Sequence, residues 1–502
     1  MHQGIKSIHS DKAALALIVL VAVIRILLAS GQELSFDEAY YWTWSQRLDY
    51  WYYDQGPMIA WFIRVFAMFS SSVVAVKLVA ITCSSVFLAF GYRLIRELAD
   101  GRIGLYWLAI IISTPLFMLG GSISTYDAPM LMFWSAACYF GYRAIHTGHP
   151  GLWLLAGCIS ALGVLSKLPT LALPVGILLT CIVTPDGRKK VASPYPWIAG
   201  FIALLPLLLL KQWDDSHGNL FTLHSASLSK RHTDAPFGRW TGDLIAGQLL
   251  VLGPTTFLGM FWALFRHRVN KDYNQRLYIA AMSLPLIMVC LILSSKSKLE
   301  VNWPIAAYFT GVIPLAMFVS SLRTRKFALL LTLIVPGWLI TIIAGMPDAL
   351  HLVGVRVKPT LAVKLYEPYG WNEVRAKILS PAHDVIKRGG FVASTNYRMT
   401  AMTAWLIGST TDVECLFAHT RNNQFVIGSQ LENRQGQDAL VVVDDVDMKD
   451  LQYLRRYFDS VTEFSNRVVV TSPSVDGPIR TIHLYACKNF HGYKIKDEAI
   501  GY

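Results

Sequence analysis

Two adjacent carboxylates, Asp37 and Glu38, lie in a segment crowded with aromatic side chains, residues 34–57, between two long apolar stretches. Neighbouring carboxylates with aromatic walls have perturbed pKa values, as a general base requires, and oxygen ligands also suit a divalent cation. The two acids are therefore candidates for a general base or for cation ligands. The alternative is that they are solvated loop acids beside an aromatic belt at a membrane interface.

The aromatic residues around these acids have two candidate roles. They can anchor a helix at the membrane interface, which the residue types alone favour, or they can form a platform for a sugar ring. The candidates for sugar or acceptor binding in this segment are Tyr40, Tyr41, Tyr53, Asp54 and Gln55.

A further carboxylate, Asp127, lies in the segment "GGSISTYDAPML", residues 120–131, with Tyr126 before it and Pro129 two residues after it. Proline suits the first turn of a helix, so Asp127 is expected at a helix start. The acid can cap that helix or take part in catalysis. Both roles place its carboxylate at the same membrane surface, and we expect it to support Asp37.

Cations on the acid-rich side of the membrane would suit an anionic ligand such as a phosphate. The segment "SSKSKLEVNWPIAAY", residues 294–308, has lysines there against the usual orientation bias, although scatter in charge placement competes as an explanation. Cations inside apolar spans are costly and are functional candidates by default. The cationic candidates are Lys167, Lys296, Lys298, Lys77 and Arg25, and the other polar or aromatic candidates near them are Tyr126, Glu300, Asn302 and Trp303.

The elements that must position these residues are membrane-length helices. The chain is 54% hydrophobic and 16% charged, well below the charge of a soluble domain, and apolar runs recur over its first two thirds. We predict about eleven transmembrane helices, at residues 13–30, 73–92, 103–119, 129–144, 151–165, 168–183, 197–210, 244–265, 277–293, 303–320 and 327–344.

Lysine and arginine bias orients these spans. Basic loops alternate with loops that hold the acids and aromatics, so we expect a cytoplasmic N-terminus with a retained first helix. An odd number of spans then places residues 346–502 outside, which is the periplasm for a bacterial inner membrane. We predict a transmembrane domain over residues 1–345 and a periplasmic α/β domain over residues 346–502, where segments such as 439–447, 467–472 and 480–487 are typical of strands and 448–458 of a helix.

The net charge of +12 does not indicate nucleic-acid binding, because the basic residues fall in short loops on one side of the spans. The cysteines show no metal-binding spacing; Cys415 and Cys487 could form a disulfide if the tail is in an oxidising compartment. Carboxylates in separate loops, with cations in others, suit deprotonation of an acceptor hydroxyl and a phosphate leaving group. They predict glycosyl transfer from a membrane-embedded sugar phosphate.

Four segments in order resemble the GT-C glycosyltransferases of the protein O-mannosyltransferase and lipid A aminoarabinose transferase type. They are "FDEAYYWTWSQRLDYWYYDQGPMIAW", "STYDAPMLMFW", "GVLSKLPTLALP" and "EVNWPIAAY", and they extend over residues 36–308. The resemblance implies an inverting transferase that takes its sugar from a polyprenyl-phosphate-linked donor, undecaprenyl phosphate in bacteria, at the periplasmic face. It also implies that Asp37 is the catalytic base, and that the acceptor is lipid A or its core, another glycan or a protein.

Some relatives of this type hold a divalent metal ion near the site and others work without one, so the metal stays open. The chain departs from the family where Gln55 and Gly56 precede Pro57, because relatives often have a basic residue there. Another cation must then bind the donor phosphate, and Lys167, Lys296 and Lys298 are the candidates. The competing function is a secondary transporter or a lipid-linked-sugar flippase, which many spans and intramembrane charges also suit. The sequence has no internal repeat of the kind that transporters show.

Overall fold

The structure is a computed structural model that describes residues 2–230, 236, 238–266, 272–322, 324–416, 422–444, 448–464 and 467–492. The chain folds as two compact units. The first, which we call the membrane unit, consists of Met1–Leu28, Gln55–Ile59 and Lys77–Ile342. The second, which we call the loop–tail unit, consists of Ala29–Asp54, Ala60–Val76 and Ile343–Tyr502. The tail thus folds together with most of the segment that carries Asp37, which the predicted division after residue 345 did not anticipate.

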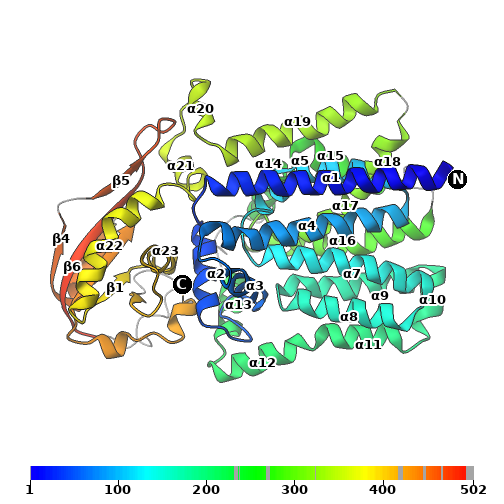
Figure 1. The fold of residues 1–502 in the computed structure, drawn as a ribbon. Helices are drawn as coiled ribbons and strands as arrows, with labels where there is room; N and C mark the ends of the chain where they lie inside the picture. Colours follow the sequence, from blue (N-terminus) through cyan, green and yellow to red (C-terminus); the bar gives the residue numbers. More distant parts are fainter. Residues whose placement is uncertain are drawn as a thin grey trace. The chain divides into compact units, whose positions relative to one another are not determined.

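The membrane unit is a bundle of helices (Figure 1). Its elements are α1 (His2–Ser30), α4 (Val73–Leu98), α5 (Gly101–Ser113), α6 (Pro115–Gly120), α7 (Asp127–Thr147), α8 (Pro150–Val164), η1 (Leu168–Leu171), α9 (Ala172–Val183), α10 (Pro185–Val191), α11 (Tyr195–Leu204), α12 (Pro206–Ser216), α13 (Leu220–Lys230), α14 (Arg239–Val251), α15 (Pro254–Phe265), α16 (Tyr273–Ser294), α17 (Ile305–Gly311), α18 (Ile313–Ser321) and α19 (Lys326–Gly345).

All eleven predicted spans are helical, but several are interrupted. In the described residues, five helices are long and apolar enough to cross a membrane, or up to seven if each of two bent pairs counts as one span. The predicted span 244–265 is in fact α14 and α15, which meet at 107°. The bend follows from Gly253, whose φ is +82°, and from the proline that begins α15, because proline cannot continue a preceding helix.

The surface of the membrane unit is apolar where its helices face outward. Exposed large hydrophobic residues recur along α1, α11, α12, α16 and α19, including Leu27, Phe201 and Phe327. The interior is closely packed and aromatic: Trp107 is buried against Phe87 and Phe309. Its indole Nε1 donates a hydrogen bond of 3.0 Å to the Phe309 carbonyl. An apolar exterior around a packed core is what a lipid environment requires, and the chain is a polytopic membrane protein.

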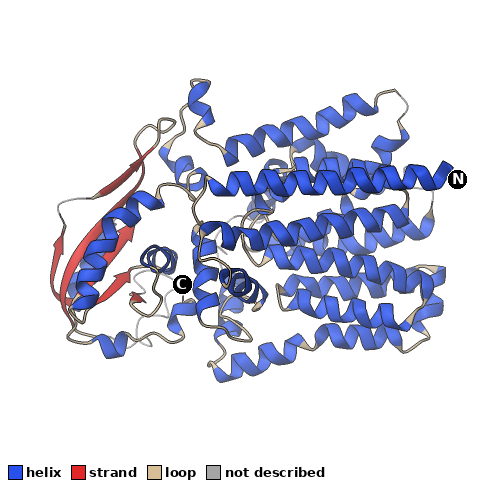
Figure 2. Cartoon of the chain, viewed as in Figure 1, coloured by secondary structure: helices blue, strands red, loops and turns tan. Residues whose placement is uncertain are grey.

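The loop–tail unit combines helices with a sheet, and the strands drawn in Figure 2 belong to it. Its helices are α2 (Phe36–Gln46), α3 (Met58–Ala67, most of which lies in this unit), α20 (Ala349–Leu352), α21 (Pro359–Leu365), α22 (Trp371–Lys387), α23 (Tyr397–Ile407), η2 (Gln424–Val426), η3 (Leu431–Arg434) and α24 (Met448–Tyr457). Its strands are β1 (Phe391–Ser394), β2 (Val413–Cys415), β3 (Ala439–Asp444), β4 (Phe458–Glu463), β5 (Val468–Thr471) and β6 (Pro478–Phe490).

The sheet has the strand order β2-β1-β3-β6-β4, and β5 also pairs with β6. β1 is parallel to β2 and β3, whereas β6 is antiparallel to β3 and places Val441 opposite Tyr485. The predicted α/β character of the tail is confirmed, with β3, β5, β6 and α24 at the expected segments. Cys415 on β2 and Cys487 on β6 do not form the disulfide with each other. Two strands separate β2 from β6, and this spacing far exceeds the Cα distance of about 7 Å that a disulfide tolerates.

Candidate active site

Three motifs that are far apart in the sequence meet in the membrane unit around Asp127. This residue begins α7, and its carboxylate is buried. Lys167, at the junction of α8 and η1, donates from Nζ to Asp127 Oδ1 at 2.7 Å. Asn302, which lies between α16 and α17, donates from Nδ2 to Oδ2 at 2.5 Å. Each carboxylate oxygen of Asp127 therefore accepts a hydrogen bond from a different motif.

Lys167 is 2% exposed, so its ammonium must be stabilised inside the protein. The carboxylate of Asp127 supplies the opposite charge, and the ring of Tyr126 lies 4.7 Å from Nζ, measured to the ring centroid. A cation above an aromatic face gains an electrostatic attraction that is larger when the cation is desolvated. The ammonium has three donors, and Asp127 accepts from one of them, so its geometry also suits an anionic oxygen.

The other residues of the Asn302 motif lie differently. Lys296, Lys298 and Glu300 are exposed, and Lys298 Nζ lies 6.0 Å from the ring centroid of Trp240. Trp303 is partly buried against the core of the membrane unit. Asn302 is thus the residue of this motif that the fold brings to Asp127.

Arg25, a predicted phosphate ligand, lies in the interior of the membrane unit and is hydrogen-bonded there. It is 1% exposed, and its nitrogens donate to Ser84 Oγ at 2.7 Å, to the Phe117 carbonyl at 2.6 Å and to the Met118 carbonyl at 3.2 Å. The two carbonyls belong to α6, and the Phe117 carbonyl also accepts a hydrogen bond of 3.2 Å from the Gly121 amide. Lys77, in the first turns of α4, is also buried.

In the loop–tail unit, the two adjacent acids have different environments. Glu38 is fully buried, and its Oε2 accepts hydrogen bonds from the amide and the hydroxyl of Ser35 at 3.0 and 3.1 Å. Ser35 Oγ in turn accepts from the Glu38 amide, which completes a capping box at the start of α2. Asp37 is half-buried in the first turn of the same helix, where the helix dipole favours a negative charge. Glu38 therefore caps the helix, and Asp37 is the better candidate for a base.

The tail supplies groups beside Asp37 that the sequence did not reveal. Helix α23 packs on α2, and the guanidinium of Arg398 lies 5.6 Å from the ring centroid of Phe36. Burial by itself would lower the pKa of Arg398, but its interactions with Tyr397, Asp37 and Glu367 raise that pKa. Glu367 Oε1 also accepts a hydrogen bond of 3.0 Å from the Phe36 amide. More than 300 residues separate these groups from α2, so no local pattern could have indicated them.

The aromatic residues predicted as anchors or as a sugar platform are buried in the loop–tail unit. Tyr40, Tyr41 and Tyr53 are buried. The Tyr40 hydroxyl donates to Asp54 Oδ2 at 2.9 Å and accepts from the Gln424 amide at 2.8 Å. The Tyr53 amide donates to Gln424 Oε1 at 2.7 Å. The tail covers these rings, which explains why they are not exposed to lipid or solvent.

The departure from the family at Gln55 and Gly56 has a packing reason. Both residues belong to the membrane unit, and a Cβ on Gly56 would lie 1.9 Å from the Leu165 carbonyl oxygen. The Met58 amide also donates to that carbonyl, at 3.4 Å. Glycine is therefore required where this segment meets the backbone two residues before Lys167. Among the residues that the structure describes, no three His, Cys, Asp or Glu side chains come together in a way that could hold a metal ion.

Known proteins resemble this chain in sequence and in fold. Residues 54–213 match the family model described as Dolichyl-phosphate-mannose-protein mannosyltransferase. The chain is 26% identical over 327 residues to the lipid A galacturonosyltransferase RgtD of Rhizobium johnstonii, which covers 63% of this chain and 67% of that protein. Its fold is that of ArnT from Cupriavidus metallidurans bound to undecaprenyl phosphate, with a TM-score of 0.64 at 12% identity over 95% of this chain and 99% of that one.

The chain has the GT-C fold and is a glycosyltransferase. The same fold extends more distantly to the archaeal oligosaccharyltransferase AglB from Archaeoglobus fulgidus, with a TM-score of 0.52 at 10% identity over 86% of this chain and 69% of that one. The predicted GT-C fold and the predicted enzyme class, a glycosyltransferase, are therefore confirmed.

Proposed function

We propose that the enzyme transfers a sugar from a polyprenyl-phosphate-linked donor to an acceptor at the periplasmic face of a bacterial inner membrane, with inversion at the anomeric carbon. Lipid A or its core is the acceptor that the similarity to the lipid A galacturonosyltransferase favours, ahead of other glycans or a protein. The orientation follows from the charge bias of the loops, with the N-terminus cytoplasmic and residues 346–502 periplasmic.

The observation that carries the proposal is the assembly of Asp127, Lys167 and Asn302. In the proposed mechanism, the ammonium of Lys167 binds the donor phosphate and stabilises the negative charge that develops on it as the sugar–oxygen bond breaks. Asp127 positions Lys167 through their ion pair, and Asn302 positions the Asp127 carboxylate through its hydrogen bond. Lys296 and Lys298, which are exposed, remain candidates for a second phosphate contact.

Asp37 is the proposed general base. It removes the proton from the acceptor hydroxyl, whose oxygen attacks the anomeric carbon from the face opposite the phosphate. A new glycosidic bond forms as the bond to the phosphate oxygen breaks, and the polyprenyl phosphate leaves with the bonding electron pair. Arg398 interacts electrostatically with Asp37, and the start of α2 is a favourable place for the negative charge of this carboxylate.

The test compares Asp37→Asn with Asp49→Asn, because both acids lie in the same unit and Asp49 accepts a local hydrogen bond from the Tyr50 amide. Purified variants are incubated with a polyprenyl-phosphate sugar and lipid A, and the product is measured by mass spectrometry. Loss of a general base lowers the rate by roughly 10²–10⁴-fold. Asp37→Asn should lose activity on this scale while Asp49→Asn keeps it, and near-normal transfer by Asp37→Asn would refute the base assignment.

The competing transporter or flippase function predicts a different outcome. Such a protein would move a lipid-linked sugar in proteoliposomes without breaking the sugar–phosphate bond. Release of polyprenyl phosphate in step with the glycosylated acceptor therefore separates the two functions in the same assay.

A further inference from the structure

The loop–tail unit exposes an apolar turn soon after α19, the helix that ends at Gly345. Helix α20 begins four residues later, and we call its end and the residues after it, 351–355, the apolar turn. Leu352 and Val353 are 85% and 72% exposed, and Val355 is 48% exposed. Single exposed hydrophobic side chains are ordinary on a protein surface, but a contiguous exposed patch marks a contact with another apolar surface.

The two ends of the apolar turn are held by the rest of the tail. Asp348, before the turn, accepts at Oδ1 from the Tyr366 hydroxyl at 2.7 Å and from Ser472 Oγ. Val357, after the turn, is 4% exposed, and its amide donates to the Ser474 carbonyl at 2.7 Å. Both ends are thus bonded to the same short segment of the tail. The turn therefore projects from a fixed base, and its apolar side chains are held outside the core.

Exposed cations border the apolar turn on its C-terminal side. Residues 349–366 include no acidic residue, but they include Arg356, Lys358 and Lys364. Arg356 forms an ion pair of 2.5 Å with Asp476, whereas the two lysines are exposed and form no ion pair within the described part of the chain. Lysine side chains can extend along an apolar surface and place their ammonium groups in a polar layer. Apolar residues beside lysines are typical of segments that lie in a membrane interface, whereas the cores of protein interfaces are depleted in lysine.

A bilayer lies within reach of the apolar turn. An extended chain covers at most about 3.3–3.6 Å per residue, so the chain from Gly345 to Leu352 spans at most about 25 Å. Helix α19 is long and apolar enough to cross a membrane, and its exposed side chains are still apolar near its end, at Ile342 and Ile343. Met346, which follows the helix, is 54% exposed. Exposed apolar residues therefore continue along the chain from a membrane span into the turn, and the bilayer is the apolar phase that they share.

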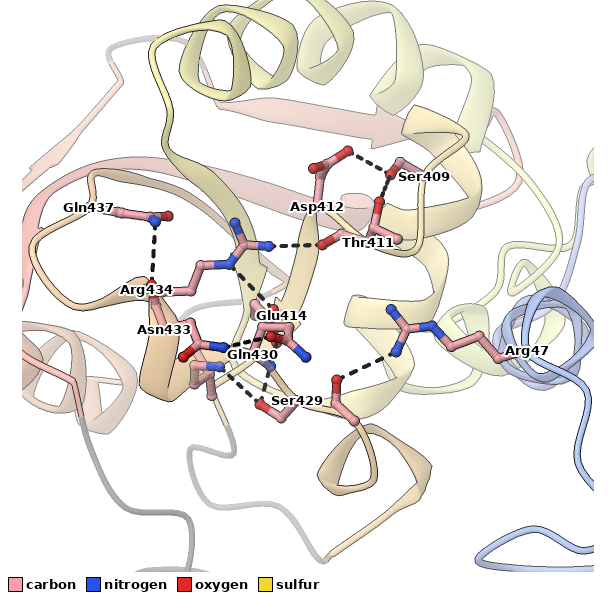
Figure 3. A network of polar contacts seen from close by, with 12 residues as sticks. Arg47, Ser409, Thr411, Asp412, Glu414, Ser429, Gln430, Asn433, Arg434 and Gln437 are labelled. Atoms are coloured by element: carbon pink, nitrogen blue, oxygen red, sulfur yellow. Dashed lines mark hydrogen bonds and ion pairs between the residues drawn. The ribbon is translucent and has the colours of Figure 1, made fainter.

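The exposed surface around η3, in the same unit, has the opposite character (Figure 3). Asn433 is exposed, and its Nδ2 donates to Gln430 Oε1 at 2.7 Å. Arg434 donates from Nη2 to the Thr411 carbonyl at 2.8 Å. Polar groups of this kind are compatible with water, whereas the apolar turn gains free energy by leaving water. Asn433 is therefore a suitable reference position for the apolar turn.

We propose that the apolar turn inserts into the interface of the bilayer that α19 crosses. Leu352 and Val353 lie among the upper acyl chains, and Lys358 and Lys364 lie among the lipid phosphates. The partner is the phospholipid surface itself. The contact anchors the loop–tail unit, which contains Asp37, to the membrane by a means other than the membrane spans. It does not depend on the proposed reaction or on the proposed base.

The experiment measures where the apolar turn lies in a bilayer. The full-length protein carries Cys158→Ser, because Cys158 is the exposed cysteine among the described residues, and Leu352→Cys adds one site for a spin label. The labelled protein is placed in nanodiscs of phosphatidylethanolamine and phosphatidylglycerol. Electron paramagnetic resonance then measures collisions of the label with oxygen, which concentrates among acyl chains, and with a nickel chelate, which stays in water. We expect oxygen collisions to exceed nickel collisions for Leu352→Cys, and the reverse for Asn433→Cys.

Val353→Asp, combined with the Leu352→Cys label, places a charge in the apolar turn. It should move the label into water and raise its nickel collisions to the level of Asn433→Cys. Val469→Asp is the matched control, because Val469 is a valine of β5 in the same unit that is 49% exposed, and it should leave the label in lipid. The proposal is overturned if the Leu352→Cys label collides with nickel as often as the Asn433→Cys label, or if it is shielded from both reagents, which indicates burial against protein. It is also overturned if Val353→Asp leaves the label in place, or if Val469→Asp moves it as far.

Discussion

Removing the charge of Lys167 should destabilise the membrane unit strongly, and Lys167→Met is the variant that tests this. Methionine has a similar length and an apolar side chain, so it fills the space but leaves Asp127 without its ion partner. The hydrogen bond from Asn302 would remain, but it does not supply a positive charge. We therefore expect the free energy of unfolding to fall because the buried Asp127 carboxylate lacks a counterion, and not because packing is lost.

The size of the effect follows from burial. The side chains of Lys167 and Asp127 are 3% and 12% exposed, and the breaking of such a pair costs about 3–5 kcal/mol. Lys211 and Asp215 form an ion pair one helical turn apart in the same unit, but their side chains are 71% and 52% exposed. Exposed helical pairs of this kind contribute about 0.3–0.5 kcal/mol. Lys211→Met is therefore a matched control with an expected effect roughly ten times smaller.

The free energy of unfolding can be measured in mixed micelles of increasing SDS content, with alkylation of the buried cysteines Cys83 and Cys138 as the signal. The double variant Lys167→Met with Asp127→Asn has no buried carboxylate without a counterion. It should recover at least half of the lost free energy of unfolding, although sugar transfer should stay impaired. Equal stability of Lys167→Met and Lys211→Met would refute the reasoning, as would a double variant no more stable than Lys167→Met.

Two other predictions concern folding. Gly56→Ala should lower the free energy of unfolding by several kcal/mol, because its Cβ would collide with the Leu165 carbonyl. Gly120→Ala should be close to neutral, because no atom lies within 4 Å of the added Cβ. The thermal unfolding midpoints of both variants, measured in the same detergent, check this prediction. The hydrogen bond of 2.6 Å from Lys488 lowers the pKa of Asp438. The folded-state pKa thus lies below the unfolded one, so the stabilisation is present above the unfolded pKa and is lost as pH falls through the folded pKa. Asp438→Asn should therefore lower the free energy of unfolding by about 0.2–1 kcal/mol at pH 7, a small effect because both side chains of the pair are about half exposed. At a pH low enough to protonate Asp438 in the wild-type protein, the two proteins should be equally stable. A difference between the two proteins that is as large at pH 2 as at pH 7 would contradict this assignment.

Local patterns predicted the membrane bundle well because hydrophobic runs report directly on buried or lipid-facing helices. The breaks were harder to place. Gly253 and Pro254 are visible in the sequence, but whether such a pair bends a span or ends one depends on what packs around it. The tail strands were recognisable for the same reason as the spans, since alternating or continuous apolar runs such as residues 439–444 indicate buried strands.

The candidate site was predictable in part. Charge bias placed Asp127, Lys167 and Asn302 on one side of the membrane, but it did not indicate that they would touch. Ser35 and Glu38 have the spacing of a capping box, a local signal that is sufficient to separate the role of Glu38 from that of Asp37. Arg398 and Glu367 had no such signal, because contacts across hundreds of residues leave no local pattern.

The pairing of α2 with the tail has a consequence for the order of events during biosynthesis. Helix α2 has 11 residues, too few to be stable by itself, and its partner α23 is made about 350 residues later. At roughly 5–20 residues per second, about 20–70 seconds separate the two. Throughout that interval the nascent chain has its membrane helices but no ordered setting for Asp37. Under the proposed role of Asp37 as the base, a ribosome that stalls before the tail is complete would leave an inserted but inactive protein.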